Sequence, residues 1–325
     1  MKRISFVLPV YNEEQVIDDF YLAITKGVEK IIEDYHIEFI FINDGSSDKT
    51  EEKLTLLHKK DKRVSIINFS RNFGHQMAIT AGIDFASGDA VIVMDSDLQD
   101  PPAVALELIS KWEEGFDVVY GVRKTRKDSA FKQLTARLFY KLINMLSEVA
   151  IPQNAGDFRL MDKKVVAELR KFREQGRFMR GLVSLVGFRQ TGVLFDRPNR
   201  YAGETKYPFK KMLKLSIDAV TSFSTVPLTL ISRLGFIVSG LSFLGILYAL
   251  LMKFFFPQVT VSGWTLLIIA IFFIGGVQMI MLGIVGTYIG KIYSEVKGRP
   301  LYIVSSIYSD SYDQDKTANK KAIRK

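Results

Sequence analysis

Two long apolar stretches in the last third of this chain constrain its fold more than any other feature. Leu234 to Phe256 and Trp264 to Ile289 are each long enough to cross about 30 Å of hydrocarbon. The loop between them, Pro257 to Gly263, carries no charge. Two buried core helices are the alternative, but segments so long with so little charge favour a pair of membrane-spanning helices.

Basic residues flank this pair on both outer sides. They are Lys206, Lys210, Lys211, Lys214 and Arg233 before the first stretch, and Lys291, Lys297 and Arg299 after the second. Because cytoplasmic flanks are enriched in Lys and Arg, both flanks are expected in the cytoplasm and the short loop outside. The first apolar run, Ile4–Val10, is too short for a signal peptide, so the preceding domain is also expected to stay in the cytoplasm.

The predicted organisation is therefore a multi-pass protein of the cell (inner) membrane in three parts. Residues 1–228 form a cytoplasmic domain with juxtamembrane helices, 229–290 a transmembrane hairpin, and 291–325 a cytoplasmic tail. The tail after Tyr302 is polar and is expected to lack regular structure, above all at its end. Because the second apolar stretch is rich in glycine, helices can pack closely there and a homo-oligomer is possible.

The first 122 residues alternate between strand and helix patterns. Five short runs rich in β-branched and aromatic residues are typical of strands buried on both faces of a parallel sheet. They are Ile4–Val10, Glu38–Asp44, Val64–Phe69, Ala90–Asp95 and Asp117–Val122. Apolar residues recur at helical spacing between them, as in Ile17, Phe20, Ile24 and Val28. The alternation predicts an α/β domain with a doubly wound, mainly parallel sheet.

Two later segments read as amphipathic helices. Residues 129–149 carry an apolar stripe that faces either the core or the bilayer surface. Residues 201–214 are basic and aromatic, a pattern that fits a helix lying on a membrane surface.

Three polar clusters each follow one of the predicted parallel strands: residues 9–14, 43–48 and 95–100. Ligands bind at the carboxyl ends of the strands in an open α/β sheet, so the three clusters are expected to converge there. If the chain stays extended, Asp95, Asp97 and Gln99 share one face, and their oxygens suit a hard cation such as Mg²⁺ or Mn²⁺. The alternatives, a polar strand end and ordinary turn and cap chemistry, stay open for each cluster alone.

Net charge and amino-acid composition limit the classes of molecule that this chain is expected to bind. The net charge of +9 favours an anionic partner, and the absence of cysteine excludes disulfides and thiolate metal sites. The basic residues gather beside the apolar stretches, which fits anionic lipid better than nucleic acid. The three histidines have no metal-ligand spacing, and His75 is expected outside the site.

Four runs together resemble a known family: Leu8–Glu14, Asn43–Asp48, Ser70–Gly74 and Asp95–Pro102. They look like family 2 glycosyltransferases of the GT-A fold. More narrowly, they resemble the polyprenyl-phosphate glycosyltransferases related to dolichyl-phosphate mannose synthase. The branch with two C-terminal membrane helices is the most similar, as in bactoprenol glucosyltransferases. The resemblance extends to about residue 300, and its motifs specify the family but not the sugar.

The resemblance implies an enzyme that transfers a sugar, first of all glucose from UDP-glucose, to polyprenyl (undecaprenyl) phosphate. It implies inversion at the sugar carbon and a need for Mg²⁺ or Mn²⁺. The chain lacks the Gln-x-x-Arg-Trp signature of processive synthases, so a single transfer is expected. The alternative is a non-enzymatic membrane scaffold with a degenerate transferase domain.

The resemblance also implies roles for individual residues. Residues of the nucleotide-sugar site are Pro9, Tyr11, Glu13, Asp44, Asp95 and Ser96. Asp97 and Gln99 hold the metal, and Asp157 and Asp97 are the catalytic carboxylates. Residues that meet donor or acceptor phosphates are Arg123, Arg126, Arg159, Arg200 and Lys206.

The role of Asp157 is qualified by the chemistry of the acceptor. A phosphate monoester has a second pKa near 6 and is mostly dianionic at neutral pH, so it scarcely needs a general base. The hypothesis is therefore that Asp157 orients a cation or Arg159 rather than removing a proton.

Overall fold

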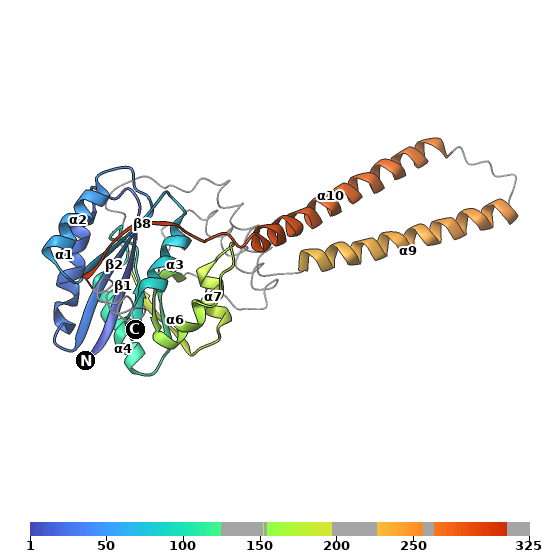
Figure 1. Ribbon diagram of the computed structural model, residues 1–325. Coiled ribbons are helices and arrows are strands. Elements are labelled where there is room, and N and C mark those ends of the chain that lie inside the picture. The colour runs from blue at the N-terminus through green and yellow to red at the C-terminus, as the bar shows by residue number, and fades with distance from the viewer. Residues whose placement is uncertain (125–151, 153–154, 197–225, 256–262, 311–325) are drawn as a thin grey trace, which may run out of the picture. The chain divides into compact units, whose positions relative to one another are not determined.

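The computed structural model describes residues 1–124, 152, 155–196, 226–255 and 263–310. They form two compact units, one built around a β-sheet and one made of two long helices (Figure 1). Residues 300–310, which follow the second long helix, belong to the sheet unit.

The sheet has eight strands in the order β7-β5-β6-β4-β1-β2-β3-β8 among the described residues. The strands are β1 Lys2–Val10, β2 Tyr35–Asn43, β3 Val64–Phe69, β4 Ala90–Val93, β5 Val118–Arg123, β6 Ala155–Asp162, β7 Gln190–Phe195 and β8 Val304–Tyr308. Strands β4, β1, β2 and β3 run parallel, as do β5 and β7, while β6 and β8 are antiparallel to their neighbours. The expected mainly parallel sheet is confirmed.

Helices cover both faces of this sheet (Figure 1). One face carries α1 Ile17–Val28, α2 Thr50–Lys60 and α4 Pro102–Glu113, and the short 3₁₀ helix Glu29–Ile31 follows α1. The other carries α3 His75–Phe85, α6 Lys163–Leu169 and α7 Met179–Leu185. Helices on both faces confirm the doubly wound arrangement and leave the carboxyl ends of β1, β2 and β4 open for a ligand.

The core follows from the apolar spacing. In α1, Ile17, Phe20, Ile24 and Val28 fall three or four positions apart and are buried against the sheet, as their spacing predicts. Phe20 meets Phe41 of β2 edge to face, with ring centroids 6.5 Å apart. Burying each such side chain contributes about 1.5–3 kcal/mol, so the helix is held mainly by its apolar face.

Three strands, β6, β7 and β8, lie outside the sequence prediction. Strand β6 carries Asp157 and Arg159, whose charges interrupt the apolar run that marks a buried strand. Strand β8 is a short edge strand with Ser305 and Ser306 in its middle. The expectation that the chain after Tyr302 lacks regular structure is therefore wrong for Val304–Tyr308, which pairs with β3.

The second unit consists of α9 Val226–Phe255 and α10 Trp264–Val296. Both are long and apolar enough to cross a membrane, with mean hydropathies of 1.6 over Leu228–Gly245 and 2.0 over Ala270–Val296. Phe236 and Phe272 are 80% and 77% exposed, surface that a bilayer would bury. Helix α10 ends seven residues beyond the expected Ile289. The amphipathic segments expected at 129–149 and 201–214 lie outside the described residues.

Candidate active site

The loops that follow β1 and β2 are joined by hydrogen bonds at the carboxyl edge of the sheet. The Asn12 amide donates to Ser46 Oγ at 3.0 Å, and the Ser47 amide donates to Asn12 Oδ1 at 2.8 Å. The loop after β4 joins them, because Ser96 Oγ donates to the carbonyl of Pro9 at 3.0 Å. The three polar clusters therefore converge, as their position after parallel strands predicts.

Asp44 fixes the next loop. Its carboxylate is buried and accepts hydrogen bonds from the amides of Phe73, at 2.7 Å, and Gly74, at 2.9 Å. Burial raises the pKa of Asp44, and the two amide bonds oppose that rise. Asp44 thus holds the segment Ser70–Gly74 against the end of β2 and places the start of α3 at the same edge.

A glycine makes this close approach possible. Gly45 has φ +66°, and a Cβ there would lie 2.4 Å from the Arg71 carbonyl carbon. Gly45→Ala is expected to lower the free energy of unfolding by about 2–3 kcal/mol, because it adds a backbone clash to the strain of the left-handed conformation. Chemical denaturation in detergent measures the loss. Gly187→Ala is the control, since Gly187 has φ +71° in open surroundings; an equal loss in both variants would contradict the clash.

The third cluster differs from the extended form expected. Strand β4 ends at Val93, and Leu98 has φ +60°, so the chain turns between Asp97 and Gln99. The Gln99 amide donates to Asp97 Oδ1 at 3.1 Å across this turn. The expectation that Asp95, Asp97 and Gln99 alternate onto one face of an extended chain is therefore wrong, although all three still lie at the same edge.

The donor set of this turn fits one kind of metal site. Within the described ranges, no group of three or more His, Asp or Glu side chains is arranged to hold a metal by itself. Asp97 and Gln99 offer one carboxylate and one amide oxygen. This suits Mg²⁺ or Mn²⁺, which takes one or two protein ligands and completes its shell with phosphate oxygens and water. The turn therefore fits a cation that arrives with a diphosphate.

Asp157, at the start of β6, is the most strongly paired carboxylate of the site. Its side chain is 7% exposed, and Arg180 of α7 donates to both oxygens, at 3.0 and 3.1 Å. Gln76 Nε2 donates to Oδ2 at 3.3 Å, and His75 Nε2 lies 3.5 Å from the same oxygen. Burial raises the pKa of Asp157, but the charge of Arg180 and the hydrogen bonds from His75 and Arg180 hold it well below its usual range. Asp157 is therefore ionised, and both of its carboxylate oxygens already accept hydrogen bonds from neighbouring side chains.

Arg159 lies behind this carboxylate. It is buried, its Nη2 donates to the Gly156 carbonyl at 2.8 Å, and the same atom lies 4.0 Å from Asp157 Oδ1. Its Nε has no hydrogen-bond partner in the part of the chain that the structure describes. The expected Asp157–Arg159 pair is thus the weaker contact, because Arg180 approaches Asp157 more closely.

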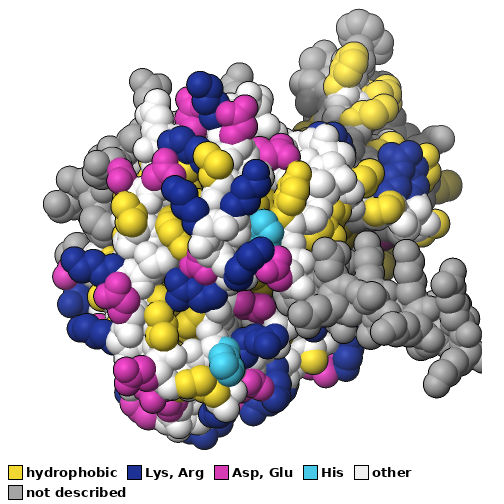
Figure 2. All heavy atoms as spheres, turned by 60° about the vertical axis from the view of Figure 1, so that its left-hand side comes forward, with side chains coloured by type: hydrophobic (Ala, Val, Ile, Leu, Met, Phe, Trp, Pro, Cys, Tyr) yellow, Lys and Arg dark blue, Asp and Glu magenta, His cyan; other side chains and the backbone are white. Residues whose placement is uncertain are grey.

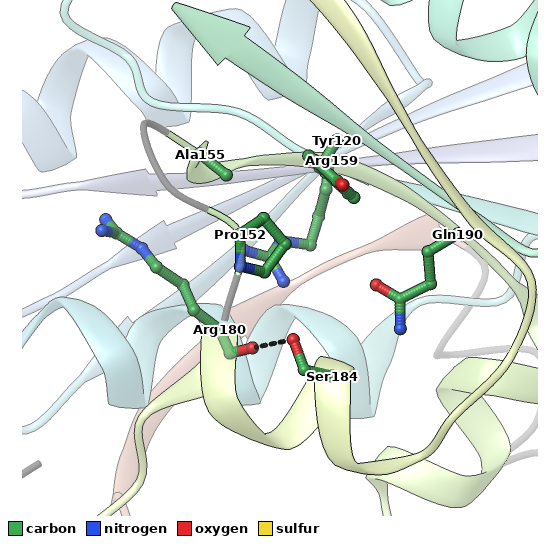
Figure 3. A pocket seen from close by; sticks show the side chains of 7 residues that line it. All are labelled: Tyr120, Pro152, Ala155, Arg159, Arg180, Ser184 and Gln190. Atoms are coloured by element: carbon green, nitrogen blue, oxygen red, sulfur yellow. Dashed lines mark hydrogen bonds between the residues drawn. The ribbon is translucent and has the colours of Figure 1, made fainter. Parts of the chain in front are cut away.

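Arg159 and Arg180 line a small pocket (Figure 3). The other lining residues are Tyr120, Pro152, Ala155, Ser184 and Gln190. In Figure 3 the Arg159 side chain reaches down beside Pro152, and the Arg180 side chain extends from α7 past the other side of Pro152. Two planar cations beside one hollow suit an anionic group, since guanidinium forks bind phosphate in two-point contacts.

His75 links the two halves of the site. Its Nε2 lies 3.5 Å from Asp95 Oδ1 and 3.5 Å from Asp157 Oδ2. Burial lowers the pKa of His75, but the hydrogen bond with Asp157 and the charge of Asp95 outweigh it and raise this pKa to about 9. At neutral pH the imidazole is therefore a cation between two carboxylates. The expectation that His75 lies outside the site is wrong.

This pairing predicts how stability varies with pH. The pKa of His75 is higher in the folded chain than the ordinary value near 6.5, so its stabilising effect is complete below pH 6.5 and is lost as the pH rises through about 9. The unfolding temperature is expected to fall between pH 6.5 and 9, and His75→Gln to reduce that fall. Differential scanning fluorimetry measures it, with exposed His36→Gln as the control. An unchanged slope in His75→Gln would contradict the charged pairing.

The remaining predicted residues are spread around this centre. Arg123 ends β5, and its Nη2 lies 3.1 Å from where a Cβ on Gly156 would stand, so the guanidinium covers the start of β6. Tyr11 and Glu13 lie in the loop after β1, where Tyr11 is 38% exposed. Arg126, Arg200 and Lys206 lie outside the described residues.

The face shown in Figure 2 carries charges of both signs. On the face shown in Figure 2, Lys and Arg side chains are interspersed with Asp and Glu instead of gathering into one patch. A compact basic surface is what nucleic-acid binding needs, so this face does not have that character.

Sequence reasoning missed three side chains that contact Asp157: His75, Gln76 and Arg180. Gln76 also accepts a hydrogen bond from the Met179 amide at 2.9 Å, which ties the first turn of α3 to the first turn of α7. No spacing in the sequence marks these partners, because they come from two helices that lie about a hundred residues apart. A carboxylate that is buried in a strand needs charged or polar partners, and this need is the only indication that such side chains should be present.

Comparisons with known proteins identify the family of the chain. The family model described as glycosyl transferase family 2 matches residues 5–170. The chain is 50% identical over 305 residues to YkcC, an uncharacterized glycosyltransferase of Bacillus subtilis, covering 94% of each chain. It is 43% identical over 303 residues to the SfII prophage-derived bactoprenol glucosyl transferase of Shigella flexneri, covering 93% of this chain and 97% of that one.

Among solved structures, the chain is similar to glucosyl-3-phosphoglycerate synthase from Mycobacterium tuberculosis in complex with Mn²⁺, UDP and phosphoglyceric acid. The identity is 17%, the TM-score 0.44, and the match covers 68% of this chain and 76% of that one. The family match over half the chain, the full-length relatives and the α/β sheet with its three converging loops lead to one conclusion. The chain belongs to glycosyltransferase family 2.

Proposed function

We propose that this chain transfers a sugar from a nucleotide-sugar to a polyprenyl phosphate at the cytoplasmic face of a membrane. One observation carries the proposal: Asp157 is buried and held by Arg180, Gln76 and His75, and the same His75 lies 3.5 Å from Asp95 in the third loop. Buried charges are costly unless they are paired, and so many of them at a ligand edge are typical of a reaction site.

The acceptor is proposed from the relatives and from the long helices. Relatives at 41–43% identity are named bactoprenol glucosyl transferases, and they match along most of this chain. Helices α9 and α10 would hold the sheet unit at the bilayer in which such a lipid resides. The basic flanks of the two helices favour a cytoplasmic location for the sheet unit and both termini. Glucose from UDP-glucose is the proposed donor.

The proposed chemistry is a single displacement with inversion, in which a phosphate oxygen of the acceptor attacks the sugar carbon and the nucleoside diphosphate leaves. Asp157 takes no proton in this scheme. Its pKa lies well below the usual range, and the dianionic phosphate is already a nucleophile. Asp157 instead positions Arg180 and, more weakly, Arg159, whose guanidinium groups would bind the acceptor phosphate.

A divalent cation is proposed as the cofactor, with Asp97 and Gln99 as its protein ligands. When bound, Mg²⁺ or Mn²⁺ would neutralise the charge that develops on the leaving diphosphate. Since the turn supplies few ligands, the cation and the nucleotide are expected to bind together. Asp44 would act beneath this site by fixing the loop 70–74 beside the nucleotide.

The test is transfer of radiolabelled sugar from a panel of UDP- and GDP-sugars to undecaprenyl phosphate, using membranes that contain the full chain and Mg²⁺ or Mn²⁺. A labelled lipid from one donor, lost with a chelator, is expected. No labelled lipid from any donor, with the chain folded and inserted, would reject the reaction.

The same experiment separates the enzyme from a membrane scaffold with a degenerate transferase domain. A scaffold would also fail to bind nucleotide in a metal-dependent manner, which isothermal titration with UDP and Mn²⁺ measures. The paired charges around Asp157 argue against it, because a degenerate site gains nothing from burying them.

A further inference from the structure

The segment Pro300–Asp310, here called the C-terminal strap, follows α10 and returns to the edge of the sheet. Its strand β8 pairs antiparallel with β3, from Ile66 opposite Tyr308 to Phe69 opposite Val304. Figure 1 shows it crossing the sheet unit in red beside the much earlier blue strands. The end of the strap that comes first in the chain therefore lies at the carboxyl end of β3, where the loop Ser70–Gly74 begins.

Tyr302 makes the first connection from the strap to that loop. Its ring stacks on Phe69, with centroids 5.1 Å apart and planes 14° apart. Phe69 in turn meets Phe73 edge to face at 5.6 Å. The Tyr302 hydroxyl donates to Asp84 Oδ2, near the end of α3, at 2.7 Å. One side chain thus contacts the strand before the loop and the helix after it.

A chain of polar contacts makes the second connection. The Ser70 amide donates to the Ile303 carbonyl at 3.0 Å, which pairs the loop with the strap directly. Asn68 Nδ2 donates to Ser306 Oγ at 2.9 Å, and Asn68 Oδ1 accepts from Asn43 Nδ2 at 2.9 Å. Asn43 is the residue before Asp44. The strap is therefore linked through two side chains to the strand end that carries Asp44.

The segment fastened in this way supplies the contacts on which the site depends. The amides of Phe73 and Gly74 bind Asp44, and His75 and Gln76 follow at once and contact Asp157. A shift of this segment would displace both sets of contacts together, because no residue separates Gly74 from His75.

We infer that the C-terminal strap is a positioning element of the donor site, with Tyr302 and Ser306 holding the loop 70–74 in its binding conformation through Phe69 and Asn68. The inference rests on the proposed nucleotide-sugar site at this edge. Neither residue touches the reacting groups; each acts through its neighbour in the sheet. The catalytic domain is thus completed by residues that lie after the second long helix.

The strap offers a matched control at its other end. Ser309 Oγ accepts a hydrogen bond from Ser65 Oγ at 2.8 Å, near the start of β3 and away from the loop. Ser306→Ala and Ser309→Ala each remove one serine hydroxyl from the same edge. A strap that only stabilises the edge of the sheet predicts similar effects for both variants. If the strap positions the loop, only Ser306→Ala should change the KM for the nucleotide-sugar.

The test measures the KM for the nucleotide-sugar and kcat in the full chain in detergent. Ser306→Ala is expected to raise the KM about three- to tenfold with kcat nearly unchanged, and Ser309→Ala to leave both unchanged. Tyr302→Leu removes both the ring stack and the hydroxyl, whereas Tyr302→Phe removes the hydroxyl only. The KM for the nucleotide-sugar is therefore expected to rise more in Tyr302→Leu than in Tyr302→Phe. Equal KM values for the two serine variants would overturn the inference.

A second readout does not depend on turnover. Hydrogen exchange followed by mass spectrometry reports on the amides of 70–76 in the full chain without donor. Faster exchange there in Ser306→Ala than in Ser309→Ala is expected, because the Phe73 and Gly74 amides lose their fixed place on Asp44. Unchanged hydrogen exchange at 70–76 in Ser306→Ala would reject the positioning role of the strap, even if sugar transfer is observed. A wild-type chain that transfers no sugar would reject the proposed function, while the exchange result still decides the role of the strap.

Discussion

Asp157→Asn is expected to lower sugar transfer by about 10³-fold or more and to lower the free energy of unfolding by about 3–5 kcal/mol. The substitution keeps the size of the side chain but removes its charge. Arg180, Arg159 and His75 then remain as neighbouring cations around a buried neutral amide, and an uncompensated buried charge costs about this much. Transfer assays and chemical denaturation in detergent measure the two losses.

A double variant separates the electrostatic cause from general damage. If the unfolding loss comes from cations left without a partner, Arg180→Leu combined with Asp157→Asn should be less destabilised than the sum of the single variants. Strict additivity would contradict this account. The rate profile gives a further check, because a carboxylate whose pKa is held well below its usual range contributes no acidic limb near neutral pH. A limb that disappears in Asp157→Asn would favour a general base instead.

Asp97→Ala is expected to abolish metal-dependent transfer, with a loss of about 10³-fold or more, while the free energy of unfolding changes by less than about 0.5 kcal/mol. Asp97 is partly exposed, and the hydrogen bond that it accepts from the Gln99 amide closes only a turn. Activity as a function of Mn²⁺ concentration and thermal unfolding without donor are the measurements.

Asp89→Ala serves as the control, because Asp89 is a carboxylate that precedes β4, at the opposite edge of the sheet, and pairs with Lys163. It should retain the wild-type response to Mn²⁺. A large fall in the unfolding temperature of donor-free Asp97→Ala would show that the residue supports the fold. Full activity of Asp97→Ala would show that Asp97 is not a ligand of the metal.

The parts of this architecture that depend on local pattern could be predicted from the sequence. The apolar runs of β1 to β5 and the helical spacing in α1 depend only on neighbouring residues, and the convergence of the three loops follows from parallel pairing. The edge strand β8 could not be predicted, because its five residues pair only with a strand far back in the chain.

The site could be predicted only in part, for a related reason. Asp157 was expected in a motif and beside Arg159, but its closer partners were not expected, since Gln76 and Arg180 meet it through the packing of α3 against α7. The extended form expected after Asp95 failed at Leu98, whose left-handed conformation closes a turn that no apolar pattern marks. Contacts between distant elements and single backbone angles carry no periodic signal.

The pairing of β8 with β3 also sets an order of events during synthesis. Asn68 and Ser306 are 238 positions apart, and both long helices lie between them in the chain. Chains are made at about 5–20 residues per second and fold from the N-terminal end, so β3 must wait on the order of ten to fifty seconds for its last neighbour. By then α9 and α10 have already left the ribosome. If the strap positions the loop 70–74 as we infer, the sheet unit gains that loop in its final position only after both long helices have been made.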